Sequence, residues 1–362
     1  MFDQTAWGWL SSLYLLLGGL AGGLALVSSI VRLYNGGMSN ETGGPRSLGP
    51  FPATSSCIAL AALAMGLACL VFELDNPDQA LALHLSFSNA GSWMTYGAWT
   101  LVAGCVVFVA NAVLATPRAR AGLLALFPHA GSRTVVIAGN AAMTAAAIVG
   151  LAIAAYTGML LRSAGSIPMW DTPLLPVLFT LSSCSMGAEV SALLLCWGDG
   201  AVRGTRQKTS PRSNAAAYRA VSIGAIAIAL LETGTLTAYV IGRASASPLG
   251  AEMARSLVEG ELAPWFWVGA VALGIVVPLV CEAIAACPPQ GAETGGPSFH
   301  GALSAAQPGA RVAKAMARPI AAIVAAACSV AGSFALRCIV IAVGVHEPLT
   351  AVQLVAASLG LF

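Results

Sequence analysis

Eight long apolar stretches divide this sequence, and they constrain its fold more than any other feature. A helix that crosses a membrane needs about 20 consecutive, mostly apolar residues. The stretches cover residues 8–34, 52–74, 93–115, 134–160, 174–197, 218–242, 265–287 and 319–345. Proline, glycine and charged residues, which are typical of loops, lie between them. The sequence therefore predicts an all-α integral membrane protein with eight transmembrane helices.

The composition excludes several other classes of protein. Of the 362 residues, 57% are hydrophobic and only 9% are charged, whereas a soluble domain carries about 25% charged residues. We therefore exclude a soluble globular enzyme, a disordered chain and a nucleic-acid-binding protein, and expect membrane lipid to surround the helices.

The basic residues predict the orientation of the helices. Thirteen of the 17 Lys and Arg residues lie at or after the ends of the first, third, fifth and seventh stretches, and three, Arg162, Arg243 and Arg255, lie on the opposite side. Cytoplasmic loops carry an excess of Lys and Arg. We therefore expect a multi-pass protein of the cytoplasmic (inner) membrane with both termini extracytoplasmic.

The predicted outer side is acidic and rich in aromatic residues. Its carboxylates belong either to solvated loops or to a surface that meets a partner subunit. The aromatic residues there include Trp93, Trp170, Tyr239, Trp265 and Trp267. An aromatic belt at the membrane interface explains most of them.

The two halves of the chain are weakly similar. Residues 92–98 and 264–270 open the third and seventh stretches with related aromatic and glycine patterns, and the second and sixth stretches each carry a glutamate, Glu73 and Glu232. This predicts two four-helix bundles, residues 1–162 and 163–362, as a parallel internal repeat. Chance similarity between apolar helices is the alternative.

Cofactor ligands are scarce. None of the four histidines, His84, His129, His300 and His346, lies in a predicted span, and a haem between membrane helices most often needs histidine ligands. None of the nine cysteines forms a C-x-x-C pair, which argues against an iron–sulfur cluster. We expect no haem, no iron–sulfur cluster and no other metal in this chain.

A few polar residues fall inside the predicted spans, and each is a candidate for function because charge in a bilayer is costly. They are Glu232, Arg337, Glu189, Asn140 and, at the end of the second span, Glu73. Glu232 and Arg337 either neutralise each other structurally or contribute to proton handling. Glu282 is expected to be solvated at the inner interface.

Six segments, taken together, resemble the NrfD/polysulfide reductase membrane-subunit family over most of the chain. They are residues 9–23, 73–77, 92–99, 156–161, 167–176 and 337–344. The resemblance implies an anchor of eight helices, without a prosthetic group, that exchanges electrons between a membrane quinone (menaquinone or ubiquinone) and an iron–sulfur subunit. That partner would be a four-cluster ferredoxin-like protein on the extracytoplasmic face, connected to a molybdopterin oxidoreductase subunit or a multihaem cytochrome.

The resemblance also implies a quinone site. Tyr156 matches a family tyrosine that can hydrogen-bond a quinone carbonyl, although it could instead belong to the aromatic belt. The start of the first span, with Gln4, Trp9 and Tyr14, would form the opposite wall. Polysulfide reductase-like members use histidine and asparagine there, and this chain has no histidine at that place.

The same resemblance places Asp75 beside Trp93, where it could exchange the proton that accompanies quinol chemistry.

Two other functions stay open. Parallel repeats and buried charge also suit a secondary transporter, and the chain could be an anchor that binds no quinone.

Overall fold

The computed structural model describes residues 9–41, 47–73, 93–127, 131–163, 167–201, 211–286 and 308–345, and every regular element in these ranges is a helix. Eight of these helices are long and apolar enough to cross a membrane. They contain the segments Leu10–Tyr34, Phe51–Phe72, Thr95–Ala115, Ser132–Arg162, Leu174–Trp197, Asn214–Ala246, Trp265–Ile284 and Arg318–Gly344. The prediction of eight spans is confirmed, and the chain is a multi-pass membrane protein.

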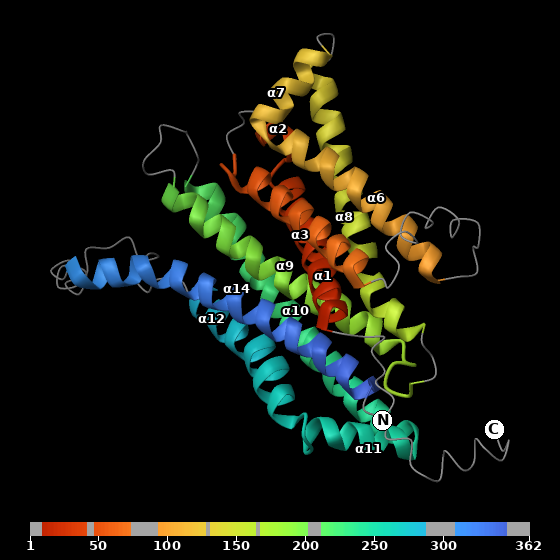
Figure 1. Cartoon of the computed structure of the whole chain (residues 1–362). Helices are drawn as coiled ribbons and strands as arrows, with labels where there is room; N and C mark the ends of the chain where they lie inside the picture. The colour runs from red at the N-terminus through yellow and green to blue at the C-terminus, as the bar shows by residue number, and fades with distance from the viewer. Residues whose placement is uncertain are drawn as a thin grey trace.

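The first four long helices pack around one another. They are α1 (Trp9–Tyr34), α3 (Phe51–Glu73), α6 (Trp93–Ala115) and α8 (Ser132–Arg162). Helix α1 packs against α3 and α8, and α6 closes the group by packing against the same two helices. Figure 1 shows this group in red to yellow-green.

The remaining long helices form a second group of packed neighbours. They are α9 (Leu174–Ala201), α10 (Pro211–Ala246), the continuous pair η2 (Trp265–Val276) and α12 (Val277–Ala286), and α14 (Pro308–Val345). Helix α9 packs against α10 and α14, and η2–α12 packs against both of these. The relation of the two groups as a repeat stays a prediction.

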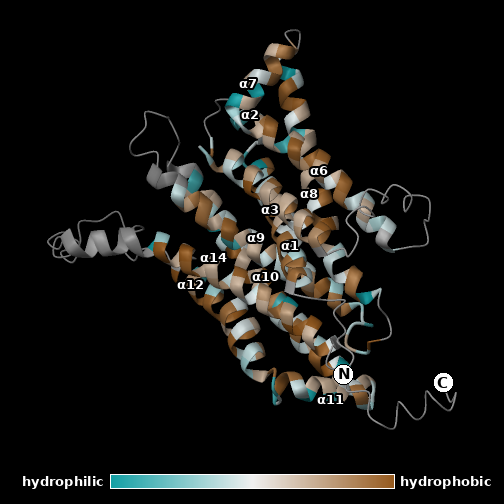
Figure 2. Cartoon of the chain, in the orientation of Figure 1, coloured by the Kyte–Doolittle hydropathy of each residue, from teal (hydrophilic) through white to brown (hydrophobic). Residues whose placement is uncertain are grey.

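Three short helices lie at the ends of the long ones. They are α2 (Gly37–Glu41), α7 (Pro117–Leu126) and α11 (Pro248–Val258). Helices α2 and α7 lie at one end of the molecule, and α11 lies at the other end with the start of α1 (Figure 1). Hydrophobic residues cover the long helices along most of their length (Figure 2), as a lipid environment requires.

Helices α1 and α9 join the two groups through closely packed small residues. A Cβ atom on Gly23 of α1 would overlap the backbone of Ser183 on α9, and one on Gly187 of α9 would overlap the backbone of Gly23. Small residues permit such close approach of membrane helices. This contact places the first turns of α1 beside α14, where the candidate site lies.

The seventh span departs from regular α-helix. Its first part, η2, is a π-helix, and Pro278 follows at the start of α12. Proline lacks a backbone N–H, and its ring would collide with the carbonyl of Gly274 in a regular α-helix. A wider turn removes that collision, so we attribute the π-helix to Pro278.

Candidate functional site

Two of the tyrosines that the sequence singles out come together near one end of the first group. Tyr14 lies in the second turn of α1 and is buried, and Tyr156 lies near the end of α8 and is half-buried. Their side chains are close enough to interact electrostatically. Two phenol groups, each able to donate and accept a hydrogen bond, thus lie near each other on α1 and α8 although 142 residues separate them.

A glycine on a third helix makes room for Tyr156. A Cβ atom on Gly97 of α6 would overlap the Tyr156 ring, so the ring packs directly on the α6 backbone. Trp93, one turn before Gly97, is exposed and belongs to a row of aromatic rings. Its ring centroid lies 5.8 Å from that of Tyr96, and the Tyr96 centroid lies 6.0 Å from that of Trp99.

The other predicted quinone-site residues cannot be placed as fully. Trp9 begins α1, but the structure does not describe its side chain. The same holds for Glu73, the candidate buried charge at the end of α3. Gln4 and Asp75 lie outside the described residues. Their roles stay predictions.

Arg337 connects three helices at the boundary between the two groups. It lies on α14 and is fully buried. Its Nε donates to the Leu15 carbonyl of α1 at 3.1 Å, Nη1 to the Ser333 carbonyl at 3.0 Å, and Nη2 to the Ser183 hydroxyl of α9 at 3.0 Å. Its guanidinium also lies 5.1 Å from the centroid of the Phe179 ring. The accepting carbonyl of Leu15 directly follows Tyr14, so Arg337 anchors the backbone beside this tyrosine.

Glu232 is linked to Arg337 indirectly, through Ser182 and Ser333, because Arg337 donates to the backbone carbonyl of Ser333. It is buried on α10, within hydrogen-bonding reach of Ser182 and Ser185 on α9, and it interacts electrostatically with Arg337. The Ser182 hydroxyl lies 2.9 Å from the Ser333 hydroxyl of α14. The ion pair found among the described residues is Arg32–Glu41. Glu232 and Arg337 therefore do not form a direct salt bridge. One Glu232 oxygen, Oε2, is buried without a hydrogen-bond partner among the residues that the structure describes.

Glu189 and Glu282 form a second buried polar centre. Glu189 lies on α9 and Glu282 on α12, and their carboxyl groups lie within hydrogen-bonding reach of each other. The expectation that Glu282 is solvated is wrong, since only 1% of it is exposed. Its position near the end of the span indicated an interfacial residue, but the side chain points inward between helices.

Two further polar groups stabilise the opposite end of the first helix group. The Asn140 side-chain oxygen accepts a hydrogen bond from the Met38 backbone N–H at 2.9 Å, which holds α2 against α8. Arg32, one of the basic residues at the end of the first predicted span, is buried and binds both carboxylate oxygens of Glu41, at 2.7 and 3.2 Å. Both contacts hold α2 in place against the long helices, so we assign them a structural role.

The aromatic residues at the predicted outer side divide into two sets. Trp93, Trp99, Trp265 and Trp267 are exposed, as a belt requires. Trp170 and Tyr239 are buried, so these two are not belt residues. Trp170 donates to the Val340 carbonyl at 2.8 Å, and Tyr239 donates to the Met169 carbonyl at 3.0 Å. They hold the segment before α9 against α14 and α10.

Metal ligands do not gather anywhere within the described ranges: no three His, Cys, Asp or Glu side chains come together there. All four histidines lie outside these ranges. The expectation that this chain binds no haem, cluster or other metal therefore stays a prediction.

Comparison with known proteins identifies the family. The model of the family described as "Polysulphide reductase, NrfD" matches residues 1–290. "Protein NrfD" of Escherichia coli strain K12 is 28% identical over 304 residues, covering 78% of this chain and 85% of that protein. The C subunit of polysulfide reductase from Wolinella succinogenes is 27% identical over 290 residues, covering 77% and 83%. The chain therefore belongs to the NrfD polysulphide reductase family.

Proposed function

We propose that this chain is the quinone-interacting membrane subunit of an oxidoreductase complex of the inner membrane. The observation that supports the proposal most is the proximity of Tyr14 and Tyr156 in a member of this family. One of its relatives is named as a single subunit of polysulfide reductase, and this similarity supports assembly with further subunits.

The residues present suit a quinone. A quinone has two carbonyl oxygens that accept hydrogen bonds, and a quinol has two hydroxyls that donate them. A phenol can satisfy either form. Tyr14 and Tyr156 would bind and orient the headgroup, and the exposed Trp93 would border the entrance from the lipid. The quinone supplies the two-electron chemistry when bound, and Arg337 fixes the backbone beside Tyr14 through the Leu15 carbonyl.

The proposed electron exchange requires a redox partner. An iron–sulfur subunit, of the four-cluster ferredoxin-like type, would dock on the extracytoplasmic face, near the end that carries Tyr14 and Tyr156. A molybdopterin oxidoreductase subunit or a multihaem cytochrome would complete the complex. The exposed aromatic residues at this end are available for lipid or for that subunit.

Substitution of Tyr156 by Phe tests the proposed contact. The change removes one hydroxyl and keeps the ring on Gly97. Losing one hydrogen bond to a neutral ligand costs about 0.5–1.5 kcal/mol, so the quinol-dependent rate of the tag-purified complex should fall about 2- to 10-fold.

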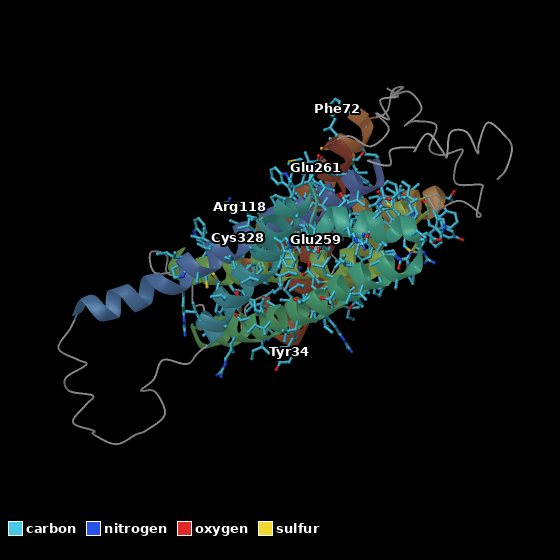
Figure 3. All side chains as sticks on the ribbon, turned by 90° about the horizontal axis from the view of Figure 1, so that it is seen from below. Tyr34, Phe72, Arg118, Glu259, Glu261 and Cys328 are labelled. Atoms are coloured by element: carbon cyan, nitrogen blue, oxygen red, sulfur yellow. The ribbon has the colours of Figure 1, made fainter. Side chains whose placement is uncertain are left out.

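Tyr34→Phe is the matched control, because Tyr34 lies at the other end of α1 and projects from the helices (Figure 3), with 80% of its surface exposed. Its quinol kinetics should equal those of the unmodified complex. Unchanged quinol kinetics in Tyr156→Phe would mean that the Tyr156 hydroxyl does not bind the quinone and that this residue belongs to the aromatic belt.

A further inference from the structure

Two buried glutamates from different helices meet in the second group of helices. Glu189 on α9 and Glu282 on α12 are 2% and 1% exposed. Their carboxyl groups lie within hydrogen-bonding reach of each other. The ion pair found in the described part of the chain is Arg32–Glu41, so neither glutamate has a cationic partner there.

This contact requires a proton. An ionised carboxylate only accepts hydrogen bonds, so two carboxyl groups can bond to each other only when one carries a hydrogen. Two ionised carboxylates in contact would also repel each other strongly in surroundings of low dielectric constant. A single shared proton supplies the missing donor and removes one of the two charges.

Among the side chains that the structure describes, neither an arginine nor a lysine contacts the pair to replace that proton. The titratable groups that lie by the pair and its immediate neighbours are a phenol and three thiols: Tyr218 on α10, Cys196 on α9, Cys281 on α12 and Cys328 on α14. All of these are neutral in their ordinary state near pH 7.

The centre also has unused hydrogen-bonding capacity. Oε2 of Glu189 and Oε2 of Glu282 are buried without a hydrogen-bond partner among the described residues. The buried Tyr218 hydroxyl lies beside Glu282 and Ser222 but makes no hydrogen bond of ordinary geometry. Buried oxygens of this kind are normally satisfied by water, and water would let a proton enter and leave.

The pair lies toward the end of the second group at which α12 ends. Glu282 is four residues before Ala286, the last residue of α12, which corresponds to about 6 Å along the helix axis. On α9, the exposed Trp197 marks the same end two turns beyond Glu189. The basic segment of residues 203–212 follows α9, so this is the end that we expect to be cytoplasmic.

We propose that Glu189 and Glu282 form a proton-binding site that holds one shared proton at neutral pH and exchanges it with the end at which α12 terminates. The ligand is a proton and not a metal cation. The inference goes beyond the proposed quinone reaction and does not depend on it.

Dicyclohexylcarbodiimide, which modifies protonated carboxyl groups in apolar surroundings, tests the site in native membranes that contain the full chain. At neutral pH, peptide mapping by mass spectrometry should find one adduct per chain shared between Glu189 and Glu282. The yield should fall as the pH is raised. Glu259 and Glu261, exposed beyond α11 (Figure 3), should stay unmodified as internal controls.

Variants separate a shared proton from two independent ones. In Glu189→Gln, the amide can donate to Glu282 in place of the proton, and one negative neighbour is gone. The pH of half-maximal modification of Glu282 should therefore move down by on the order of one unit. Glu282→Gln should do the same for Glu189, and Glu252→Gln, at an exposed carboxylate on α11, should leave the midpoint of the pair unchanged.

Three results would overturn the proposal. No modification of either residue at neutral pH would mean that both are ionised, and a yield that does not fall at alkaline pH would mean that both are permanently neutral. Protection by NaCl, but not by choline chloride, at constant pH would identify a sodium site instead. None of these results bears on the Tyr156→Phe kinetics, so the two proposals can fail separately.

Discussion

Arg337 is the residue on which the contact between the two helix groups depends most. It is fully buried, and its three hydrogen bonds join α14 to α1 and α9. A Cβ atom on Gly19 would collide with its guanidinium, so the site is shaped for this side chain. Removing the cation also leaves the buried Glu232 carboxyl without its nearest positive charge.

We therefore expect Arg337→Gln to destabilise the protein by on the order of 3–5 kcal/mol, the cost of leaving one buried charge uncompensated. Thermal unfolding of the purified chain in detergent measures this. Adding Glu232→Gln should recover part of the loss, because it removes the remaining charge. Arg255→Gln, at an exposed cation on α11, should behave like the unmodified chain. Equal stability of Arg337→Gln and the unmodified chain would refute this account.

Glu232→Gln alone separates the two interpretations of that residue. If Glu232 only compensates Arg337, the single variant should be less stable and turnover should follow the amount of folded protein. If it carries protons, the variant should fold normally and lose quinol-linked turnover. The serine-mediated connection, with one free carboxylate oxygen, favours the second outcome. Normal stability together with normal turnover would exclude both.

At the residue scale, the sequence predicts which polar residues are buried better than it predicts their partners. Glu232, Arg337 and Glu189 are buried as candidates for function should be. The solvated position expected for Glu282 and the belt position expected for Trp170 are both wrong. Hydropathy reports how deep a residue lies along a helix, but the rotation of the helix decides which neighbour its side chain meets.

Among the helices, the contact of α1 with α9 is the most sensitive to added volume. Gly23 faces the Ser183 backbone and Gly187 faces the Gly23 backbone, and backbone atoms cannot move aside as side chains can. Gly23→Ala should therefore destabilise the chain by at least about 1–3 kcal/mol, as overpacking does, with a lower thermal unfolding temperature in detergent.

Gly224→Ala is the matched control for that substitution. Gly224 also lies inside a transmembrane helix, α10, but a Cβ atom there would meet nothing within 4 Å. Alanine favours helix over glycine by about 1 kcal/mol, so this variant should be as stable as the unmodified chain or slightly more stable. A similar effect of both substitutions would contradict the close packing of α1 on α9.

Most ends of the long helices were predictable to within a few residues, but α10 and α14 begin at Pro211 and Pro308, well before the predicted stretches 218–242 and 319–345. Some of the internal geometry of the helices was not predictable. The sequence did not predict that the first part of the seventh span forms a π-helix. Short helices such as α7 and α11 were also missed, because they lie between spans and carry too few apolar residues to stand out. Helix α11 packs Met253 and Leu257 into the core, so tertiary packing supports it.

For the whole molecule, the orientation in the membrane is the next prediction to test. The basic segments should be cytoplasmic, so Ser210→Cys should resist an impermeant thiol reagent in intact cells. Ser256→Cys, on the exposed side of α11, should react. The unmodified chain, with its native cysteines, measures the background. The opposite labelling pattern would reverse the topology and the proposed docking face.

The central claim is that a membrane quinone binds between the start of α1 and the end of α8. Photoaffinity labelling with an azidoquinone in native membranes, mapped by mass spectrometry, tests it most directly. We predict adducts in the peptides that contain Tyr14 and Tyr156, suppressed by excess unlabelled quinone and reduced in a Tyr14→Phe, Tyr156→Phe double variant. Adducts confined to other helices, or labelling of these peptides that excess quinone does not suppress, would contradict it.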